Sequence, residues 1–153
     1  MRLSTIHVER IATIAGAVLT VETNGEGFCE ITSDAAAFLQ RIAAKDGVLL
    51  LFLRHTSASL VIQENADPDV QTDLVTALRR LAPANAGWVH EVEGADDMPA
   101  HIKAMLAGAC LHVPVAAGRM QLGTWQGIYV AEHRARPHAR EVVLQFLGAC
   151  EEA

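Results

Sequence analysis

Seven histidines occur among the residues that could do chemistry, and three of them lie in different segments beside polar neighbours. His55 follows an unbroken apolar run, His90 lies in an acidic loop, and His101 falls in the first turn of an expected helix. Three imidazoles brought together by folding would suit zinc or a similar divalent ion, with a fourth position open to water. Spacing alone leaves a second interpretation open, in which each histidine is hydrogen-bonded locally and no shared site exists.

Acidic residues stand next to these segments. Asp97 precedes His101 by four residues, so the two side chains share one side of the expected helix. An aspartate placed there could fix the imidazole tautomer or act as a base, and it could also do no more than cap the helix. Helix capping explains residues 67–69. It does not explain Glu64 and Asn65, and we expect these two to be a functional pair.

A glycine-rich motif, Leu122–Ile128, interrupts a strand pattern near the C-terminus. Glycine within a strand often marks a bulge or a close approach of the backbone to a ligand. Strict alternation would place Gln126 and Glu132 on one face, where they could line a cavity, unless Gly127 changes the parity. A well-packed corner is the alternative. The chain contains no nucleophile elbow, Walker loop or dinucleotide fingerprint.

The composition limits the kinds of molecule that the protein could bind. The 153 residues suit a single domain, 1–153, and 51% apolar against 20% charged residues excludes intrinsic disorder. A net charge of −6 argues against nucleic acid or an anionic membrane as the principal partner, but a small phosphorylated metabolite remains compatible. Three widely spaced cysteines and the lack of a signal-peptide pattern favour a cytoplasmic protein.

The elements that must position these residues are mostly strands joined by short turns. The apolar run Val48–Leu53 is expected to be a strand buried on both faces, and Asn24-Gly25 a hairpin turn. The other expected strands are 3–23, 27–32, 57–64, 110–115, 119–124, 126–134 and 139–147. Helices are expected from Ser33 or Asp34 to about Ala44, from Pro68 to Pro83, and from Pro99 to Gly108.

This order predicts an α+β fold, a mainly antiparallel β-sheet sandwich with two or three helices laid on it. The mean hydropathy of +0.22 is high for a monomer of this size. It indicates apolar surface buried between subunits in a closed symmetric ring, although an alanine-rich composition would also raise the value.

Several long motifs together resemble the YjbQ family, in order and with compatible spacing from about Gly27 to Gly148. These motifs are His55–Leu60, Glu64–Pro68, Glu93–Lys103, Gly123–Ile128 and Glu132–Arg134. The resemblance implies a compact, mainly antiparallel α+β domain that assembles as a homotrimer. It also implies a secondary thiamine-phosphate synthase activity, which joins a pyrimidine diphosphate to a thiazole phosphate and releases pyrophosphate.

The three histidines correspond to the motif histidines of the family, and a metal-assisted transferase would give their polar neighbours roles as well. The expected metal ligands are His55, His90 and His101; the catalytic carboxylates Glu64, Asp97 and Glu132; and the substrate-binding residues Asn65, Lys103, Thr124 and Gln126. The cofactor would be a divalent ion, zinc for the histidines or magnesium if carboxylates supply the ligands. A metal-dependent hydrolase or lyase on another phosphorylated metabolite, and a non-catalytic metal- or ligand-binding trimer, remain alternatives. Which carboxylate is the base, and whether the site lies within or between subunits, stay open.

Overall fold

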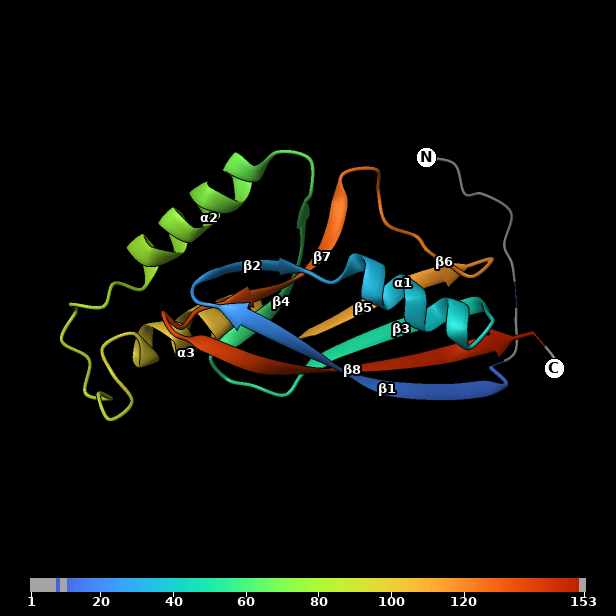
Figure 1. The fold of residues 1–153 in the computed structure, drawn as a ribbon, viewed down its shortest axis with the longest axis horizontal. Helices are drawn as coiled ribbons and strands as arrows, with labels where there is room; N and C mark the ends of the chain where they lie inside the picture. The colour runs from blue at the N-terminus through green and yellow to red at the C-terminus, as the bar shows by residue number, and fades with distance from the viewer. Residues whose placement is uncertain (1–7, 9–10, 152–153) are drawn as a thin grey trace.

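Two antiparallel sheets form the body of the protein (Figure 1). The structure is a computed structural model that describes residue 8 and residues 11–151. In that part of the chain the strands are β1 (Thr13–Asn24), β2 (Gly27–Glu30), β3 (Ala44–Leu53), β4 (Ala58–Glu64), β5 (Cys110–Ala116), β6 (Arg119–Met120), β7 (Gln126–Glu132) and β8 (Pro137–Cys150). The helices are α1 (Thr32–Arg41), α2 (Pro68–Leu81) and α3 (Asp97–Ala107). The predicted α+β class is confirmed.

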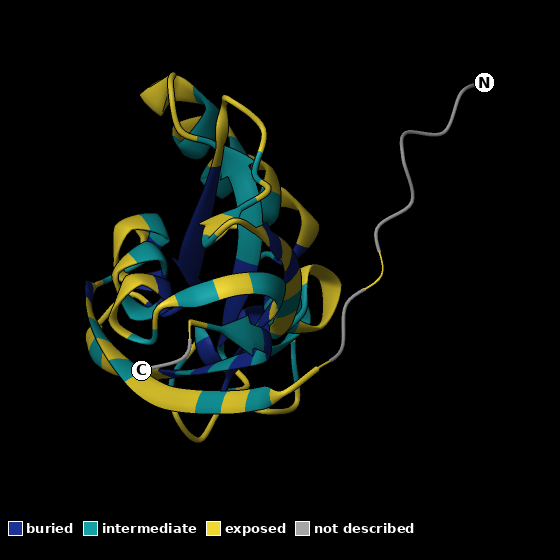
Figure 2. Cartoon of the chain, turned by 90° about the vertical axis from the view of Figure 1, so that its right-hand side faces the viewer, coloured by how far each residue is buried: buried dark blue, intermediate teal, exposed yellow. Residues whose placement is uncertain are grey.

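The core lies between the sheets. The larger sheet has the strand order β1-β8-β3-β5-β6 and the smaller one β2-β7-β4, and the smaller sheet and α1 lie on the same face of the larger one (Figure 1). Figure 2 shows buried residues gathered in the interior, with exposed and half-buried residues along the outer strand β1. Strands β3, β5, β7 and β8 supply most of the buried apolar side chains: Leu49, Leu51, Leu53, Val113, Val115, Ile128, Tyr129, Val130, Ala131, Val142, Leu144 and Phe146.

The predicted helix after Asp67 is confirmed. The Asp67 carboxylate caps it by accepting a 2.9 Å hydrogen bond from the Asp69 N–H, and Pro68 occupies the first helical position. Arg79 and Arg80 lie in its last turn, where positive charge is favourable. None of the residues of α2 is buried, so this helix leans away from the body of the protein (Figure 1).

Two local predictions were wrong. Asn24-Gly25 makes a turn but not a hairpin, because β1 pairs with β8 while β2 pairs with β7, so the chain changes sheets there. Strand β3 is buried on one face only, since Val48 and Phe52 keep exposed fractions of 36% and 45%. An apolar run can therefore have one face against the core and leave the other uncovered.

The remaining differences are in the bounds of elements. The strand expected over 119–124 is reduced to β6, because a turn over Gly123–Gln126 replaces its second half. Residues 3–7, 9 and 10 of the first expected strand lie outside the described part of the chain. Among the described residues, no helix has both the length and the apolar character needed to cross a membrane.

Candidate metal centre

Two of the predicted histidines meet an aspartate at the start of α3. The Nε2 atom of His90 lies 2.8 Å from Oδ2 of Asp97, and the Nε2 atom of His101 lies 3.6 Å from the same oxygen. All three ligand atoms lie within 4.8 Å of one another. The predicted spacing of four residues on one helix face brings Asp97 and His101 together, and the loop before α3 carries His90 to them.

His101 is held in one orientation. Its Nδ1 atom lies 3.0 Å from the carbonyl oxygen of Thr56. A carbonyl can only accept, so Nδ1 carries the proton and donates it, which leaves Nε2 with its lone pair directed at the cluster. A metal-binding histidine commonly has this arrangement, with one ring nitrogen bonded to a backbone carbonyl and the other available as the ligand.

Arg134 holds the aspartate. Its guanidinium is buried and donates to Oδ1 of Asp97 in a close ion pair, so Oδ2 is the oxygen that faces the histidines. The same guanidinium donates to Oδ2 of Asp96 at 3.1 Å and to the carbonyl of Glu93 at 2.8 Å. Burial raises the pKa of Asp96, but hydrogen bonds from the Ala135 N–H and Arg134 outweigh it and leave that pKa below its usual value. The Glu93 carboxylate lies 3.5 Å from the same guanidinium, so three carboxylates surround one positive charge and make this end of the protein favourable for a cation.

The donor set fits zinc better than magnesium. Tetrahedral ligands at about 2.0–2.1 Å from zinc stand about 3.3 Å apart, and the separations of the two histidine nitrogens from the Asp97 oxygen, 2.8 Å and 3.6 Å, lie on either side of that value. Two imidazole nitrogens and one carboxylate oxygen are common zinc donors, whereas magnesium prefers oxygen ligands. The site is accessible, because the side chains of His90 and His101 are 47% and 34% exposed.

His55 is placed differently from the other two histidines. Its Nε2 atom accepts a 2.9 Å hydrogen bond from the backbone N–H of Glu141, and it does not belong to the cluster of ligand atoms found among the described residues. Burial, followed by the charge of Arg140, holds the pKa of His55 below its usual value, which is consistent with a neutral acceptor. The carboxylate of Asp97 thus takes the place in the cluster that the sequence suggested for His55.

Glu132 lies in the interior at 1% exposure and accepts four hydrogen bonds. Arg140 donates two of them, at 2.6 Å and 2.7 Å, and the Thr23 hydroxyl and the Arg134 N–H donate the others at 2.7 Å and 2.9 Å. Burial raises the pKa of Glu132, but these donors outweigh it and leave the pKa below its usual value. These contacts suit a structural anion, because a proton acceptor in catalysis needs a lone pair that substrate can reach.

Four other predicted site residues lie at the far end of the smaller sheet: Glu64, Asn65, Thr124 and Gln126. In the β4–β7 ladder, Ala58 pairs with Glu132 at one end and Glu64 pairs with Gln126 at the other. Six residue steps of about 3.3 Å put these ends about 20 Å apart. Within one chain, the structure therefore does not bring these residues to the histidines.

The glycine-rich turn at that far end is closed by contacts of its own. The Gln126 side-chain oxygen accepts a 2.8 Å hydrogen bond from the Gly123 N–H. A side chain at Gly127 would place its Cβ 2.8 Å from a Glu30 carboxylate oxygen and 3.2 Å from the Asn65 Cβ. The strand runs through Gly127 without a bulge, and the close neighbours of this glycine are protein side chains.

Lys103 lies on the opposite side of α3 from His101, because two residues along a helix turn the side chain by about 200°. It is 4% exposed, and its ammonium group lies 2.5 Å from a Glu26 carboxylate oxygen. A substrate bound at the histidines would therefore not meet Lys103.

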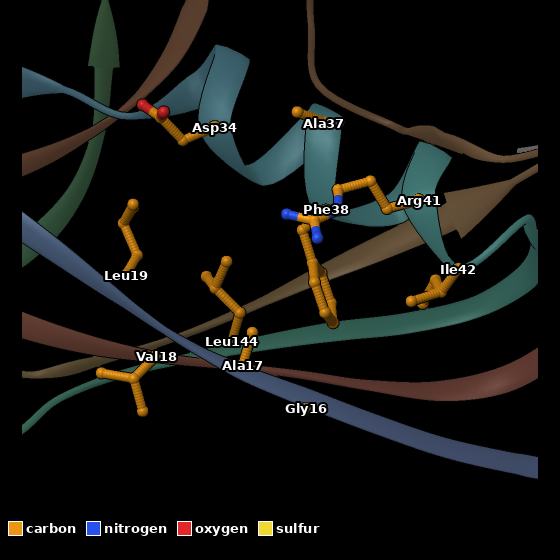
Figure 3. Close-up of a pocket in the computed structure, with 10 residues that line it drawn as sticks. All are labelled: Gly16, Ala17, Val18, Leu19, Asp34, Ala37, Phe38, Arg41, Ile42 and Leu144. Carbon is orange, nitrogen blue, oxygen red and sulfur yellow. The ribbon is translucent and has the colours of Figure 1, made fainter.

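A separate cavity of about 450 Å³ lies between β1 and α1 (Figure 3). Its lining residues are mostly apolar, with Phe38 in the centre of the view, and Asp34 and Arg41 from α1 are the charged ones. None of the predicted site residues lines it.

Sequence reasoning missed the residues that orient the cluster. The residue pattern gives the Arg134 side chain no role of its own, and Thr56 acts through its backbone, where side-chain type gives no signal. The available signal was position: both residues lie inside motifs, Glu132–Arg134 and His55–Leu60, in which only the neighbouring residues were expected to have roles.

Comparisons with known proteins agree with the motif resemblance. A family model described as UPF0047 protein YjbQ-like matches residues 17–149. The UPF0047 protein sll1880 of Synechocystis sp. is 46% identical over 132 residues, covering 86% of this chain and 90% of that relative, and YjbQ of Escherichia coli O157:H7 is 41% identical over 85% and 95%. Among solved structures, a YjbQ/UPF0047 protein of Clostridium acetobutylicum superposes with a TM-score of 0.77 at 35% identity, over 86% of this chain and 98% of that one. Motifs, fold and relatives coincide over most of the sequence, and the chain belongs to the YjbQ-like UPF0047 family.

Proposed function

We propose that the protein is a metal-assisted enzyme that acts on a small phosphorylated metabolite, with zinc held by His90, Asp97 and His101. The observation that carries this proposal is the convergence of three ligand atoms within 4.8 Å at an accessible surface. The hydrogen bond from His101 to the Thr56 carbonyl and the Arg134–Asp97 ion pair support it, because both fix ligand atoms before any ion binds.

When bound, a divalent ion would neutralise phosphate oxygens and stabilise a departing phosphate or pyrophosphate. The chain's own contribution is orientation. Asp97 presents one oxygen to the centre while Arg134 retains the other, and His101 presents Nε2 because Nδ1 is engaged. Holding these groups in place avoids a reorganisation cost at the moment of reaction.

The specific reaction we propose is the one that the family resemblance implies, condensation of a pyrimidine diphosphate with a thiazole phosphate and release of pyrophosphate, in the cytoplasm. A second candidate, hydrolysis of another phosphate ester, is favoured by the exposure of His90 and His101, since bulk water can reach the centre. The roles of Glu64, Asn65, Thr124 and Gln126 in substrate binding stay predictions and require that their end of the sheet meets the histidines of another subunit.

We also propose a homotrimer. The outer face of the larger sheet supports this, because Ile14, Val18 and Phe52 there are 67%, 52% and 45% exposed in the single chain. Exposed apolar surface of this kind is commonly buried between subunits.

The test begins with metal-depleted protein titrated with zinc and assayed with both thiamine precursors and a panel of phosphate monoesters. His101→Ala should weaken zinc binding by more than the roughly 10–100-fold that loss of an outer hydrogen-bonding partner costs, and should abolish turnover. His112→Ala is the matched control, because His112 is an exposed histidine on β5 outside the cluster. Rapid turnover of a monoester with feeble condensation would favour the hydrolase. Zinc binding that is equal in the wild type and His101→Ala would refute the proposed centre.

A further inference from the structure

Another pocket, with several charged residues in its lining, lies on the other side of α3. Its cavity of about 310 Å³ is bounded by the end of α2, by α3 and by the segment that follows β7. Among its lining residues are Glu26, Arg79, Lys103 and His133. None of the three residues of the candidate metal centre lines it.

Two cations in this pocket share one carboxylate. The Lys103 ammonium, buried at 4% exposure, lies 2.5 Å from one oxygen of Glu26, and the Nε atom of Arg79 donates to the other oxygen at 2.6 Å. Lys103 comes from α3 and Arg79 from α2, so the two positive groups approach from different walls. Within this group of three side chains, two cations share a single carboxylate.

Of the other polar residues that line the pocket, His133 is neutral and Asp96 adds a second carboxylate. His133 is 3% exposed and hydrogen-bonds Ser59 Oγ through Nε2 at 2.8 Å. Its burial, together with the nearby Lys103, lowers the pKa of His133 to about 4, so the ring is neutral at pH 7. Asp96, which also lines the pocket, is engaged by the Arg134 guanidinium and the Ala135 N–H.

We propose that this pocket binds the phosphate group of a small ligand, with Lys103 and Arg79 exchanging the Glu26 carboxylate for phosphate oxygens. A phosphate monoester carries a charge of about −1.5 to −2 at pH 7, which matches the two cations once Glu26 has turned away. Arginine offers a planar fork of donors to phosphate, and lysine offers a point charge. The exposed position of Arg79, at 63%, gives the ligand a way in from solvent.

This inference goes beyond the proposed metal chemistry and does not depend on it. Lys103 and His101 lie on opposite faces of α3, so the two sites can be tested separately. The competing explanation is a salt bridge that only ties the bend before β2 to α3 and α2, and it predicts a different result for changes at Glu26. A purely structural carboxylate can only lose stability when it is changed, whereas a carboxylate that competes with the ligand should give tighter ligand binding when its charge is removed.

The experiment titrates inorganic phosphate, and in a second arm a phosphate monoester such as glycerol phosphate, into the full chain. Calorimetry at low ionic strength with a chelator present keeps metal out of the measurement. We expect Arg79→Gln to weaken binding by about ten-fold or more, as expected for loss of a charged hydrogen bond. Glu26→Gln should strengthen binding, and Arg80→Gln, on the neighbouring exposed residue of α2, should change it less than two-fold.

Further variants control for misfolding and distinguish this pocket from the candidate metal centre. Lys103→Met should also weaken binding, and a thermal melt shows whether that variant is folded; Arg79→Gln alters an exposed side chain and carries the test if it is not. His101→Ala should leave phosphate binding unchanged. Tighter binding of the monoester than of phosphate would identify a phosphorylated metabolite, and equal binding would identify free phosphate. No binding of either probe to the wild type and Glu26→Gln, or binding that Glu26→Gln weakens, overturns the proposal.

Discussion

Replacing Arg140 with methionine tests whether Glu132 is a structural anion. The substitution removes two short hydrogen bonds, at 2.6 Å and 2.7 Å, and leaves a carboxylate at 1% exposure with only the Thr23 hydroxyl and the Arg134 N–H. Breaking a buried ion pair on one side costs about 3–5 kcal/mol, a large part of the ~5–15 kcal/mol that stabilises a typical domain. With a urea m-value of about 2 kcal/mol/M, the midpoint should fall by about 1.5–2.5 M.

The same explanation predicts how the stability loss of Arg140→Met changes with pH. In the wild type the Glu132 pKa is lowered, so its stabilising contribution is present above the unfolded pKa and is lost as pH falls through the folded value. Without Arg140, burial raises that pKa instead. The stability gap between wild type and Arg140→Met should therefore narrow as pH falls from 7 towards 5, because the buried carboxyl becomes neutral.

Urea unfolding of Arg140→Met, Glu132→Gln and the double variant, at pH 7 and pH 5, makes the measurement. The double variant should recover part of the loss, because it leaves no unpaired buried charge. Thr23→Val, which removes one of the four donors, is the control and should cost about 1 kcal/mol. A loss below about 1 kcal/mol for Arg140→Met at pH 7, or a gap that widens in acid, would refute the reasoning.

Three further outcomes are expected. The pKa of His133 is lowered to about 4, so between pH 6.5 and pH 4 the unfolded chain binds more protons than the folded one. The free energy of unfolding should therefore decrease as pH decreases through this window, by at most about 3 kcal/mol. Urea unfolding of His133→Gln should show a weaker dependence on pH. Gly127→Ala should destabilise by about 1–3 kcal/mol in the same assay because its Cβ would meet the Glu30 carboxylate at 2.8 Å, whereas Gly16→Ala, whose nearest neighbour is at 3.6 Å, should cost little. Phe52→Lys should shift the sedimentation of the proposed trimer towards monomer, and Val89→Lys, at a fully exposed loop position, should not; equal sedimentation of both would place the interface elsewhere.

The elements that the sequence predicted best are those with local signals. The Asp67-Pro68 start of α2 is such a signal, and the structure confirms it. The pairing of β1 with β8 depends on a strand more than 100 residues away, which no turn motif can reveal. The Asn24-Gly25 dipeptide correctly indicated a turn, but whether two strands continue in one sheet after a turn is decided by the core that each of them covers.

The candidate site follows the same pattern. The four-residue spacing of Asp97 and His101 predicted a shared helix face, and the structure confirms it. His90 joins them through a loop, which the acidic neighbours indicated but spacing could not show. The position of His55 could not be predicted from the sequence. Its ring nitrogen accepts from a backbone N–H of β8, and backbone groups give no signal in the residue types.

Glu132 can nevertheless affect the candidate metal centre without touching it. Its carboxylate accepts from the Arg134 N–H at 2.9 Å, and the Arg134 side chain holds Asp97. On its other side Glu132 binds Arg140, which donates to the Ser57 hydroxyl at 3.2 Å, next to the Thr56 carbonyl that orients His101.

Two hydrogen-bonded routes thus lead from one buried carboxylate to two of the three proposed ligands. A loss of activity in Glu132→Gln would consequently not identify a general base, because displaced ligands would produce the same loss. The two roles predict different effects on zinc affinity. Removing a general base leaves zinc binding unchanged, whereas removing a residue that positions the ligands weakens it. Zinc titration of Glu132→Gln therefore separates the two, and we expect affinity to fall by about ten-fold, as for an outer partner of a ligand.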